Sequence, residues 1–594
     1  MSGRSRQLRR CVRGIVVVLA LCGSLVPAVS AQAAERGRAA PVPLERLFDN
    51  VAVSDDDRPG EADFDGAGSS LSARDLTAAG WTPGRALTLQ GARLTWPKRG
   101  PGEPDNVRAA GQDVRVAGRG DALAFLVAGT SGTATGGEGT VVYANGTRSA
   151  YRLTAPDWRT GPLATKAVAL PHVNTPGGQL AERARLYVVT VPLVPGRAVA
   201  SVRLPKAAGL HVFAVAVRPA AAGWTGSWTT STGGYAAVGP WTDRTLRLVV
   251  HTSAGGPRVR VRFDNTFAAA PVRIGAATVA LRASGAAARG APVPLSFGGA
   301  AGVEVPAGAQ AYSDPLGFAV PADADLLVSF HLPGTVAAAP LHRPQQRSYV
   351  SEPGDHAADG SAGPYTSVIT AWPLLAGVDV GGGPGSVVLL GDSITDGDKS
   401  TVDANRRWPD VLADRLLSQD TVPRYGVLNQ GVSGNRVVTD RYPGDGVSTD
   451  TAGVSALHRF DRDVLAQTSA RTAVVFEGVN DLRWDTSADQ VIAGLREIAA
   501  RGHARGLRML AATILPCEGE ARCTAAVDTE RRAVNAWIRD GGVYDGVLDF
   551  DAVVRDPQQP SRMLPAYDSG DHLHPGDTGL AALADSVDLR LLRP

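Results

Sequence analysis

Two short stretches near the end of the chain contain residue types that could together perform acyl transfer. Ser393 lies in Gly-Asp-Ser-Ile-Thr, directly after the apolar run of residues 386–390. Asp571 and His574 stand three positions apart within residues 568–579. A serine hydroxyl is a poor nucleophile until a base takes its proton, and the base needs an acid to orient it. Ser393, His574 and Asp571 therefore have the residue types of a nucleophile, a base and an acid.

Two more stretches could supply hydrogen-bond donors for an oxyanion. Gly434 falls in residues 428–435, and a glycine can bring its backbone N–H close because it has no side chain. Asn480 falls in residues 477–481 and offers a side-chain amide. Each stretch taken alone is an ordinary turn sequence. All four in this order, each at a predicted strand end or just before a predicted helix, favour one shared site.

Simpler interpretations stay open for each stretch. Gly-Asp-Ser is also good turn chemistry, and Asp571 with His574 could be a capping acid beside an exposed histidine. His572 and His574 could form half of a metal site, but no third ligand is evident nearby. The sequence predicts no metal.

The elements that must position these residues alternate between two patterns. The chain shows buried strand-like runs separated by amphipathic stretches of helical period, a pattern typical of a parallel sheet covered on both faces. Such sheets place ligands at the carboxyl ends of their strands. The predicted strands are residues 386–390, 425–429, 472–476, 508–513 and 546–550.

The four stretches in this order resemble the SGNH hydrolases, also called the GDSL family, over residues 386–594. The resemblance implies a flavodoxin-like three-layer domain in which Ser393 is the nucleophile and Asp571 and His574 complete the triad. It also implies an oxyanion hole formed by the Ser393 N–H, Gly434 and Asn480. The family's usual Leu is replaced by Ile394, followed by Thr395, as in the carbohydrate-esterase and lysophospholipase-like branches. No Gly-x-Ser-x-Gly motif of the α/β-hydrolase elbow is present.

The chain before this domain has the pattern of β-sandwiches. Residues 41–218 and 224–380 show short apolar runs between Gly, Pro and Asp clusters, with a linker near residues 218–224. The first region is similar to galactose-binding-like modules, and the other resembles the accessory sandwich of secreted bacterial relatives. Five tryptophans of these regions could stack on sugars or belong to the cores: Trp96, Trp158, Trp224, Trp228 and Trp241. Asn405 and Trp408 could shape the substrate pocket, although Trp408 also fits a packed helix start.

The N-terminus predicts export. Residues 1–33 combine arginines, a short apolar run and an Ala-Gln-Ala cleavage site, which is typical of a signal peptide of the general or twin-arginine type. No later stretch is apolar enough to predict a transmembrane segment. In an exported protein, Cys517 and Cys523 are expected to form a disulfide, with two free thiols as the alternative.

The charge balance argues against nucleic acid as a partner. The chain has 60 Lys and Arg against 58 Asp and Glu, and five of the arginines fall in the predicted leader. A nucleic-acid-binding protein would need a basic face or stripe, which the rest of the sequence does not show.

We therefore expect a secreted serine esterase that needs no cofactor and removes O-acetyl groups from a polysaccharide. One alternative is a lipase or lysophospholipase acting on longer acyl chains. Another is a glycan- or cell-wall-binding protein whose hydrolase domain is inactive. The sandwiches are candidates for glycan binding in all three cases.

Overall fold

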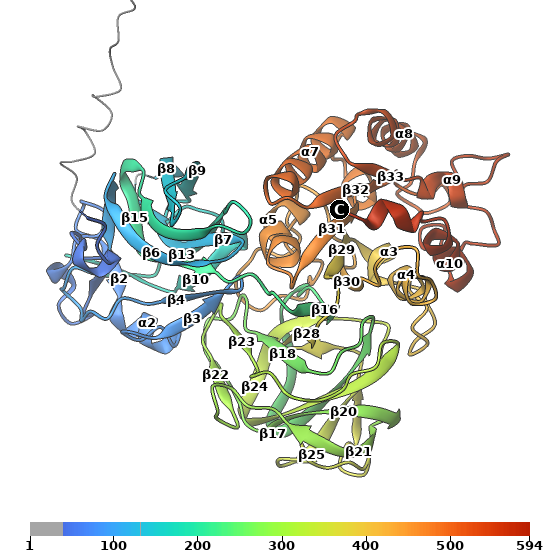
Figure 1. The fold of residues 1–594 in the computed structure, drawn as a ribbon, viewed down its shortest axis with the longest axis horizontal. Coiled ribbons are helices and arrows are strands. Elements are labelled where there is room, and N and C mark those ends of the chain that lie inside the picture. The colour runs from blue at the N-terminus through green and yellow to red at the C-terminus, as the bar shows by residue number, and fades with distance from the viewer. Residues whose placement is uncertain (1–39, 131) are drawn as a thin grey trace, which may run out of the picture. The chain divides into compact units, whose positions relative to one another are not determined.

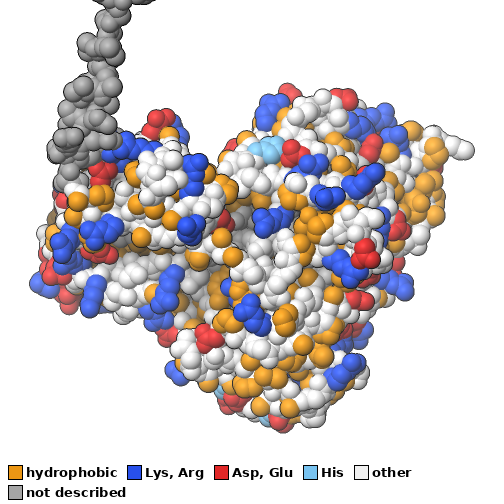
Figure 2. Space-filling view, viewed as in Figure 1, with side chains coloured by type: hydrophobic (Ala, Val, Ile, Leu, Met, Phe, Trp, Pro, Cys, Tyr) orange, Lys and Arg blue, Asp and Glu red, His pale blue; other side chains and the backbone are white. Residues whose placement is uncertain are grey.

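The computed structural model describes residues 40–130 and 132–594, so the predicted signal peptide lies outside the described residues. Within the described ranges, no helix has both the length and the apolar character needed to cross a membrane. On the face shown in Figure 2, Lys and Arg side chains are scattered among acidic and apolar ones.

The last third of the chain forms the predicted parallel sheet. Its strands run in the order β30-β29-β31-β32-β33, and all are parallel. In this order, β30 lies on one side of β29, and the later strands β31, β32 and β33 lie on the other side. The strand order therefore reverses between β29 and β31, and folds of this class bind ligands at such a switch point. The strands are β29 (Ser386–Gly391), β30 (Gly426–Gly431), β31 (Ala470–Phe476), β32 (Arg508–Ala512) and β33 (Gly546–Leu548).

Helices cover both faces of this sheet, as predicted, because its strands are apolar on both sides (Figure 1). Val388 and Leu390 pack into one core, and Val387 and Leu389 pack into the other. On the first face lie α5 (Ala456–Phe460), the π-helical turn η4 (Asp461–Leu465), α7 (Ala488–Ala504) and α8 (Ala525–Asp540). On the second lie α4 (Trp408–Leu417), α9 (Phe550–Val554) and α10 (Asp577–Asp585).

The first region is a β-sandwich, as predicted. A five-stranded sheet packs against a four-stranded sheet through alternating inward residues such as Phe125 and Val141. The larger sheet is β10 (Lys166–Leu170), β13 (Ala184–Pro192), β7 (Ala122–Gly129), β15 (Lys206–Arg218) and β5 (Val107–Ala110). The smaller is β6 (Asp113–Arg119), β14 (Ala198–Arg203), β8 (Thr135–Tyr143) and β9 (Arg148–Ala155).

A second core lies on the far face of the larger sheet and includes Phe64, Trp81 and Leu76 of α2 (Ala73–Ala78). A small sheet flanks it, formed by β1 (Val53–Ser54), β2 (Ser70–Ser72), β11 (Val173–Thr175) and β12 (Gly178–Leu180).

The second region is also a sandwich, around a core that contains Leu246, Phe263 and Phe330. One sheet is β21 (Ala287–Pro294), β20 (Ala277–Ser284), β24 (Ala324–His342), β17 (Gly234–Thr252), β25 (Ser348–Pro353) and β26 (Ser367–Ile369), with β27 (Trp372–Pro373) paired to β24. The other is β16 (Trp224–Thr229), β28 (Leu375–Gly381), β18 (Val259–Asp264), β23 (Gln310–Tyr312), β3 (Ala86–Leu89) and β4 (Ala92–Thr95). A separate pair is β19 (Val272–Ile274) with β22 (Val303–Val305). The hairpin β3–β4 comes from the first region, so this sheet joins the two sandwiches.

The second sandwich covers the open edge of the parallel sheet. Edge strand β30 leaves backbone groups unpaired, and the Ser253 hydroxyl lies 2.9 Å from the N–H and 3.1 Å from the carbonyl oxygen of Val427. The backbones come close here, because a Cβ on Gly426 would lie 1.9 Å from the carbonyl oxygen of Gly226. Strand β16 and strand β30 therefore pack without room for a side chain at Gly426.

Most of the candidate sugar-stacking tryptophans are core residues. Trp96, Trp158, Trp228 and Trp241 are at most 9% exposed. Trp224 is only partly buried and carries Arg258 and Arg260 over its ring. The core interpretation therefore holds for four of the five.

Candidate active site

Ser393 is the first residue of the short helix α3 (Ser393–Asp396), which follows β29. The Asp392 side chain caps this helix by accepting a hydrogen bond of 3.0 Å from the Ile394 N–H. The strand reaches this turn through Gly391, where a Cβ would lie 2.1 Å from Thr395 Oγ1. The tight strand-to-helix turn thus holds Ser393 at the carboxyl end of β29, and Ser393 is 5% exposed.

The structure brings Ser393, His574 and Asp571 together. Ser393 Oγ lies 2.8 Å from His574 Nε2, and His574 Nδ1 lies 2.8 Å from Asp571 Oδ2. With Nδ1–H donating to Asp571, the neutral ring presents Nε2 as an acceptor for the Ser393 hydroxyl. The geometry therefore allows a proton to leave Ser393 for a base that is already oriented.

Asp571 is held as a carboxylate. Its Oδ1 atom accepts backbone hydrogen bonds from Leu573 at 3.0 Å and from His574 at 2.8 Å. Burial by itself would raise the pKa of Asp571, but the hydrogen bonds from the His574 backbone and ring and from Leu573 outweigh it and lower the pKa well below the ordinary value. Lys399 Nζ lies 3.7 Å from Oδ2 and adds a weaker attraction.

Three donors predicted for an oxyanion hole lie on neighbouring turns. Gly434 has a positive φ of 78°, and a Cβ there would lie 3.1 Å from Ala452 Cβ, so the turn favours glycine. Within the part of the chain that the structure describes, the backbone N–H groups of Ser393 and Gly434 donate no hydrogen bond. Both remain available for an incoming oxygen.

Asn480 lies on α6 (Val479–Leu482), just after β31. Its Nδ2 donates to the carbonyl oxygen of Asn435 at 3.1 Å, which ties this turn to the one that carries Gly434. Its Oδ1 accepts from Arg483 NH1 at 3.0 Å. Because one N–H of the amide is engaged and the oxygen is held, the amide is oriented with a second N–H left to donate.

A disulfide supports this orientation. Cys517 and Cys523 are joined, as predicted, and enclose the loop that carries Glu520. Glu520 pairs with Arg483 at 2.8 Å, and Arg483 in turn holds Asn480. The predicted disulfide thus connects through two charged side chains to the predicted oxyanion donor.

Arg459 joins the strand ends beneath the site and was missed by sequence reasoning. Its fully buried guanidinium donates to the carbonyl oxygens of Gly391 at 2.8 Å and Gln430 at 2.7 Å, and to Asn435 Oδ1 at 2.8 Å. It also lies 3.2 Å from Glu477 Oε1. An arginine within an amphipathic helix was the only sequence signal, and it does not say which way the side chain points.

Glu477, the acid that pairs with Arg459, lies near two other buried acids, Asp392 and Asp481. Burial raises the pKa of Asp392 to about 6 and that of Asp481 to about 6. Burial together with the neighbouring Asp392 raises the pKa of Glu477 well above its ordinary value, against the attraction of Arg459. Arg459 therefore offsets part of the cost of burying Glu477 beside these acids.

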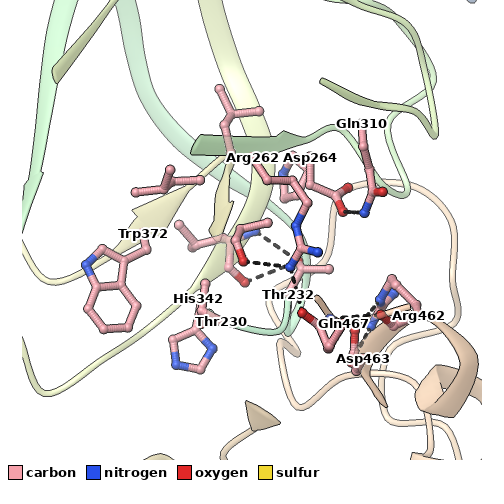
Figure 3. Close-up of a pocket in the computed structure, with 15 residues that line it drawn as sticks. Thr230, Thr232, Arg262, Asp264, Gln310, His342, Trp372, Arg462, Asp463 and Gln467 are labelled. Carbon is pink, nitrogen blue, oxygen red and sulfur yellow. Dashed lines mark hydrogen bonds and ion pairs between the residues drawn. The ribbon is translucent and has the colours of Figure 1, made fainter. Parts of the chain in front are cut away.

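Helix α3 is also held from the second sandwich. His342, the last residue of β24, lies 2.9 Å through Nε2 from Asp396 Oδ1 and donates through Nδ1 to the Ser231 carbonyl oxygen at 2.9 Å. Figure 3 shows His342 beside Trp372, and the two rings stack 5.7 Å apart. Both His342 and Asp396 are at most 5% exposed.

The pocket of Figure 3 lies between the second sandwich and η4 and does not include the Ser393 cluster. Arg262 of β18 reaches Gln467 at 2.9 Å, and Arg462 pairs with Asp463 at 2.6 Å. This pocket is therefore part of the contact between the sandwich and the parallel-sheet domain.

Three other candidate residues have structural partners. His572 pairs with Asp568 at 2.6 Å. Trp408 is fully buried against Phe550 and belongs to the core. Asn405 donates to Asp325 of the second sandwich at 3.2 Å. Among the described residues, no group of three or more His, Cys, Asp and Glu side chains could hold a metal ion.

Residues 389–582 match the model of the GDSL-like lipase/acylhydrolase family. The chain carries a domain of this family. This match confirms the predicted resemblance of the last third of the chain and supports an esterase of the SGNH class.

Residues 38–221 match a second family model, the AziU2-like beta-sandwich domain. This match agrees with the predicted N-terminal sandwich that precedes the GDSL-like domain. The finer resemblance to galactose-binding-like modules stays a prediction.

Several solved structures are similar to the GDSL-like region. A protein from Desulfitobacterium hafniense assigned to the lipolytic G-D-S-L family is 21% identical, covers 35% of this chain and 99% of its own, and has a TM-score of 0.27. A GDSL-like lipase from Bacteroides thetaiotaomicron is 18% identical; the match covers 35% of this chain and 87% of that protein, with a TM-score of 0.26. An acetylxylan esterase from Geobacillus stearothermophilus is 19% identical; the match covers 35% of this chain and 93% of that protein, with a TM-score of 0.27. A comparison with curated proteins finds no match.

Proposed function

We propose that the protein is a secreted serine esterase that hydrolyses carboxylic esters through an acyl-enzyme and removes O-acetyl groups from a polysaccharide. The observation that carries this proposal is the hydrogen-bonded series Ser393, His574 and Asp571, with 2.8 Å at each step. The Cys517–Cys523 disulfide supports export, because such bonds persist in oxidising compartments.

The chemistry follows from the hydrogen bonds. Ser393 Oγ attacks the ester carbonyl carbon while its proton moves to His574 Nε2, and Asp571 stabilises the imidazolium that forms. The carbonyl oxygen gains negative charge and accepts hydrogen bonds from the N–H groups of Ser393 and Gly434 and from the Asn480 amide.

The second half of the cycle reverses the proton transfers. The bond between the carbonyl carbon and the alcohol oxygen breaks, and His574 gives its proton to the leaving alcohol. A water molecule then attacks the acyl-enzyme, passing a proton to His574, and the acid product leaves as the Ser393 hydroxyl is restored. No step requires a cofactor.

The acyl-chain preference is the finer part of the proposal. Two β-sandwiches ahead of the hydrolase domain favour a polymeric substrate, and removal of a short acyl group from a polymer suits an enzyme with accessory domains. The sandwiches would then hold the glycan, with Trp224 as the candidate that is not fully buried.

The test is hydrolysis of p-nitrophenyl esters from acetate to palmitate by the purified mature protein. We expect activity on acetate that falls with chain length, and we expect Ser393→Ala to abolish turnover because no acyl-enzyme can form. Comparable turnover by Ser393→Ala in a clean preparation would rule out the assignment of the nucleophile. A maximum at long chains would instead identify a lipase.

A further inference from the structure

An exposed tryptophan stands beside the predicted oxyanion hole. Trp484 is 41% exposed, although large aromatic side chains are usually buried. It follows Asn480 by four residues, roughly one helical turn, and its backbone N–H donates to the Asp481 carbonyl oxygen at 3.1 Å. Its neighbour Arg483 holds the Asn480 side chain. The indole is therefore attached to the turn that carries an oxyanion donor.

Three guanidinium groups surround this indole. The Cζ atom of Arg522 lies 3.7 Å from the ring centroid, that of Arg436 lies 5.0 Å away, and that of Arg441 lies 5.5 Å away. Stacking on an aromatic ring fixes the plane of a guanidinium and leaves its N–H edges free to bind an anion in a bidentate manner. Arg436 and Arg441 belong to the loop between β30 and α5, and Arg522 belongs to the disulfide loop, so the cluster forms only in the folded chain.

Two of these cations form no ion pair with any described residue. Arg441 pairs with Asp450 at 2.9 Å. In residues 40–130 and 132–594, neither the Arg436 nor the Arg522 guanidinium forms an ion pair or a hydrogen bond with the protein. Arg436 is only 8% exposed, and its buried Nε atom has no hydrogen-bond partner.

Leaving a buried cation unpaired is costly. Burial lowers the pKa of Arg436, and the neighbouring cations Arg441 and Arg483 lower it further. The nearby acids Asp481 and Asp450 act in the opposite direction but do not outweigh these effects. An anion bound at Arg436 would supply the missing partner.

The two unpaired cations belong to the segments that carry or support the predicted oxyanion donors. Arg436 comes two residues after Gly434, so their Cα atoms are at most about 7.6 Å apart. The intervening Asn435 accepts the hydrogen bond from Asn480 at 3.1 Å. Arg522 lies in the disulfide loop whose Glu520 pairs with Arg483. Arg436 is thus attached to the turn of Gly434, and Arg522 to the loop that supports Asn480 through Glu520 and Arg483.

We propose that Arg436 and Arg522, held against Trp484, bind an anionic group of the substrate next to the scissile ester and thereby select acetylated acidic saccharides. This inference rests on the proposed esterase function and gives its substrate class. Uronate, phosphate and sulfate groups all fit two guanidinium edges, and they share the chemistry of a compact oxyanion. The two arginines take no part in the proton transfers among Ser393, His574 and Asp571. They determine which ester substrate binds beside these residues.

The test compares two polymers with the mature full-length protein, namely partially O-acetylated polygalacturonate and partially O-acetylated dextran. We expect wild-type kcat/KM to favour the anionic polymer. Arg436→Gln and Arg522→Gln should each lower the anionic-to-neutral ratio of kcat/KM about tenfold, a fold-change expected for one lost charge-assisted contact. Raising NaCl from about 0.05 to about 0.5 M should lower the wild-type ratio in the same direction, because salt screens the attraction.

The matched control is Arg496→Gln. Arg496 of α7 also lies over a tryptophan, with its Cζ atom 5.7 Å from the ring centroid of Trp537 in α8. Neither residue belongs to the segments that carry the predicted oxyanion donors. The Arg496→Gln variant should have the same anionic-to-neutral ratio of kcat/KM as wild type. Arg522 is exposed, so Arg522→Gln keeps the test valid if the buried Arg436→Gln variant fails to fold.

The outcomes separate the two proposals. Wild-type protein that hydrolyses no ester, p-nitrophenyl acetate included, would contradict the esterase function itself. If the wild-type protein hydrolyses esters but Arg522→Gln has the same anionic-to-neutral ratio of kcat/KM as wild type, the anion site alone is overturned. A higher kcat/KM on anionic lysophospholipid micelles than on either polymer would replace the saccharide by a lipid.

Discussion

At the scale of single residues, the structure shows how an amide is oriented for a predicted catalytic task. Asn480 is held at both ends, by the Asn435 carbonyl oxygen and by Arg483. Arg483 is itself held by Glu520 in the disulfide loop. An oxyanion donor is effective only if it needs no reorientation during the reaction, so these supporting contacts matter as much as the amide itself.

Asn480→Ala should lower kcat about 10²-fold or more, because one preorganised donor is lost. KM should change much less if the amide contacts mainly the developing oxyanion. Steady-state kinetics on p-nitrophenyl acetate measure both constants. An unchanged kcat would remove Asn480 from the oxyanion hole.

At the scale of elements, α3 depends on contacts at both of its ends. Asp392 caps its N-terminus, and His342 of the second sandwich binds Asp396 at its C-terminal end. Because Nδ1 of His342 donates to a carbonyl oxygen, Nε2 can donate to Asp396 only when the ring is an imidazolium. Burial would lower the pKa of His342, but Asp396 and the Ser231 carbonyl raise it above the ordinary value, against the repulsion of Arg407. His251 and Asp410 line the same small pocket as His342 and Arg407.

His342→Leu should destabilise the protein by about 3 kcal/mol near pH 6, because it leaves the buried Asp396 carboxylate without its partner. The helix that carries Ser393 would also lose its anchor, so kcat should fall. A raised pKa in the folded state means that the stabilisation is complete below the ordinary imidazole pKa and is lost as pH rises through the raised value.

The measurement is urea unfolding of wild type and His342→Leu between about pH 5 and pH 9. The difference in the free energy of unfolding should shrink as pH rises. A difference that does not depend on pH would show that His342 contributes packing and not charge. His458→Leu is a control, because that histidine pairs with Asp440 and is more exposed.

At the scale of the whole molecule, the second sandwich is joined to the hydrolase domain through a sheet edge. Strand β16 covers β30, and the Ser253 hydroxyl pairs with the Val427 backbone. Open edges of this kind invite pairing with other chains, so covering β30 protects the GDSL-like domain. The two regions are therefore expected to unfold together.

Gly426→Ala tests this contact, because the added Cβ would lie 1.9 Å from the Gly226 carbonyl oxygen. We expect a loss of stability of about 1–3 kcal/mol, the usual cost of overpacking. Scanning calorimetry should show a lower Tm or a transition divided in two. Gly334→Ala is the matched control, since a Cβ there meets nothing within 4 Å. An equal Tm for both variants would contradict the close approach.

The sequence by itself determined the local features. The strands of the parallel sheet are apolar on both faces, and their period distinguishes them from the amphipathic helices between them. Helix α4 begins at Trp408, the residue that fits a helix start in the sequence. Ser393, His574 and Asp571 could be chosen because each has a side chain that suits only a few roles, at a place where this fold binds ligands. The Cys pair could be found because the two residues are close in the sequence.

Only the tertiary structure decided which side chains from distant segments meet. Arg459, His342 and Arg436 resemble ordinary surface or helix residues in the sequence, yet each is buried beside atoms from another segment. The hairpin β3–β4 crosses a boundary that composition places near residue 218. The physical reason is that sequence patterns report local backbone preference and the average burial of a face. The direction of a long charged side chain depends instead on partners that arrive from elsewhere in the chain and offset its cost of burial.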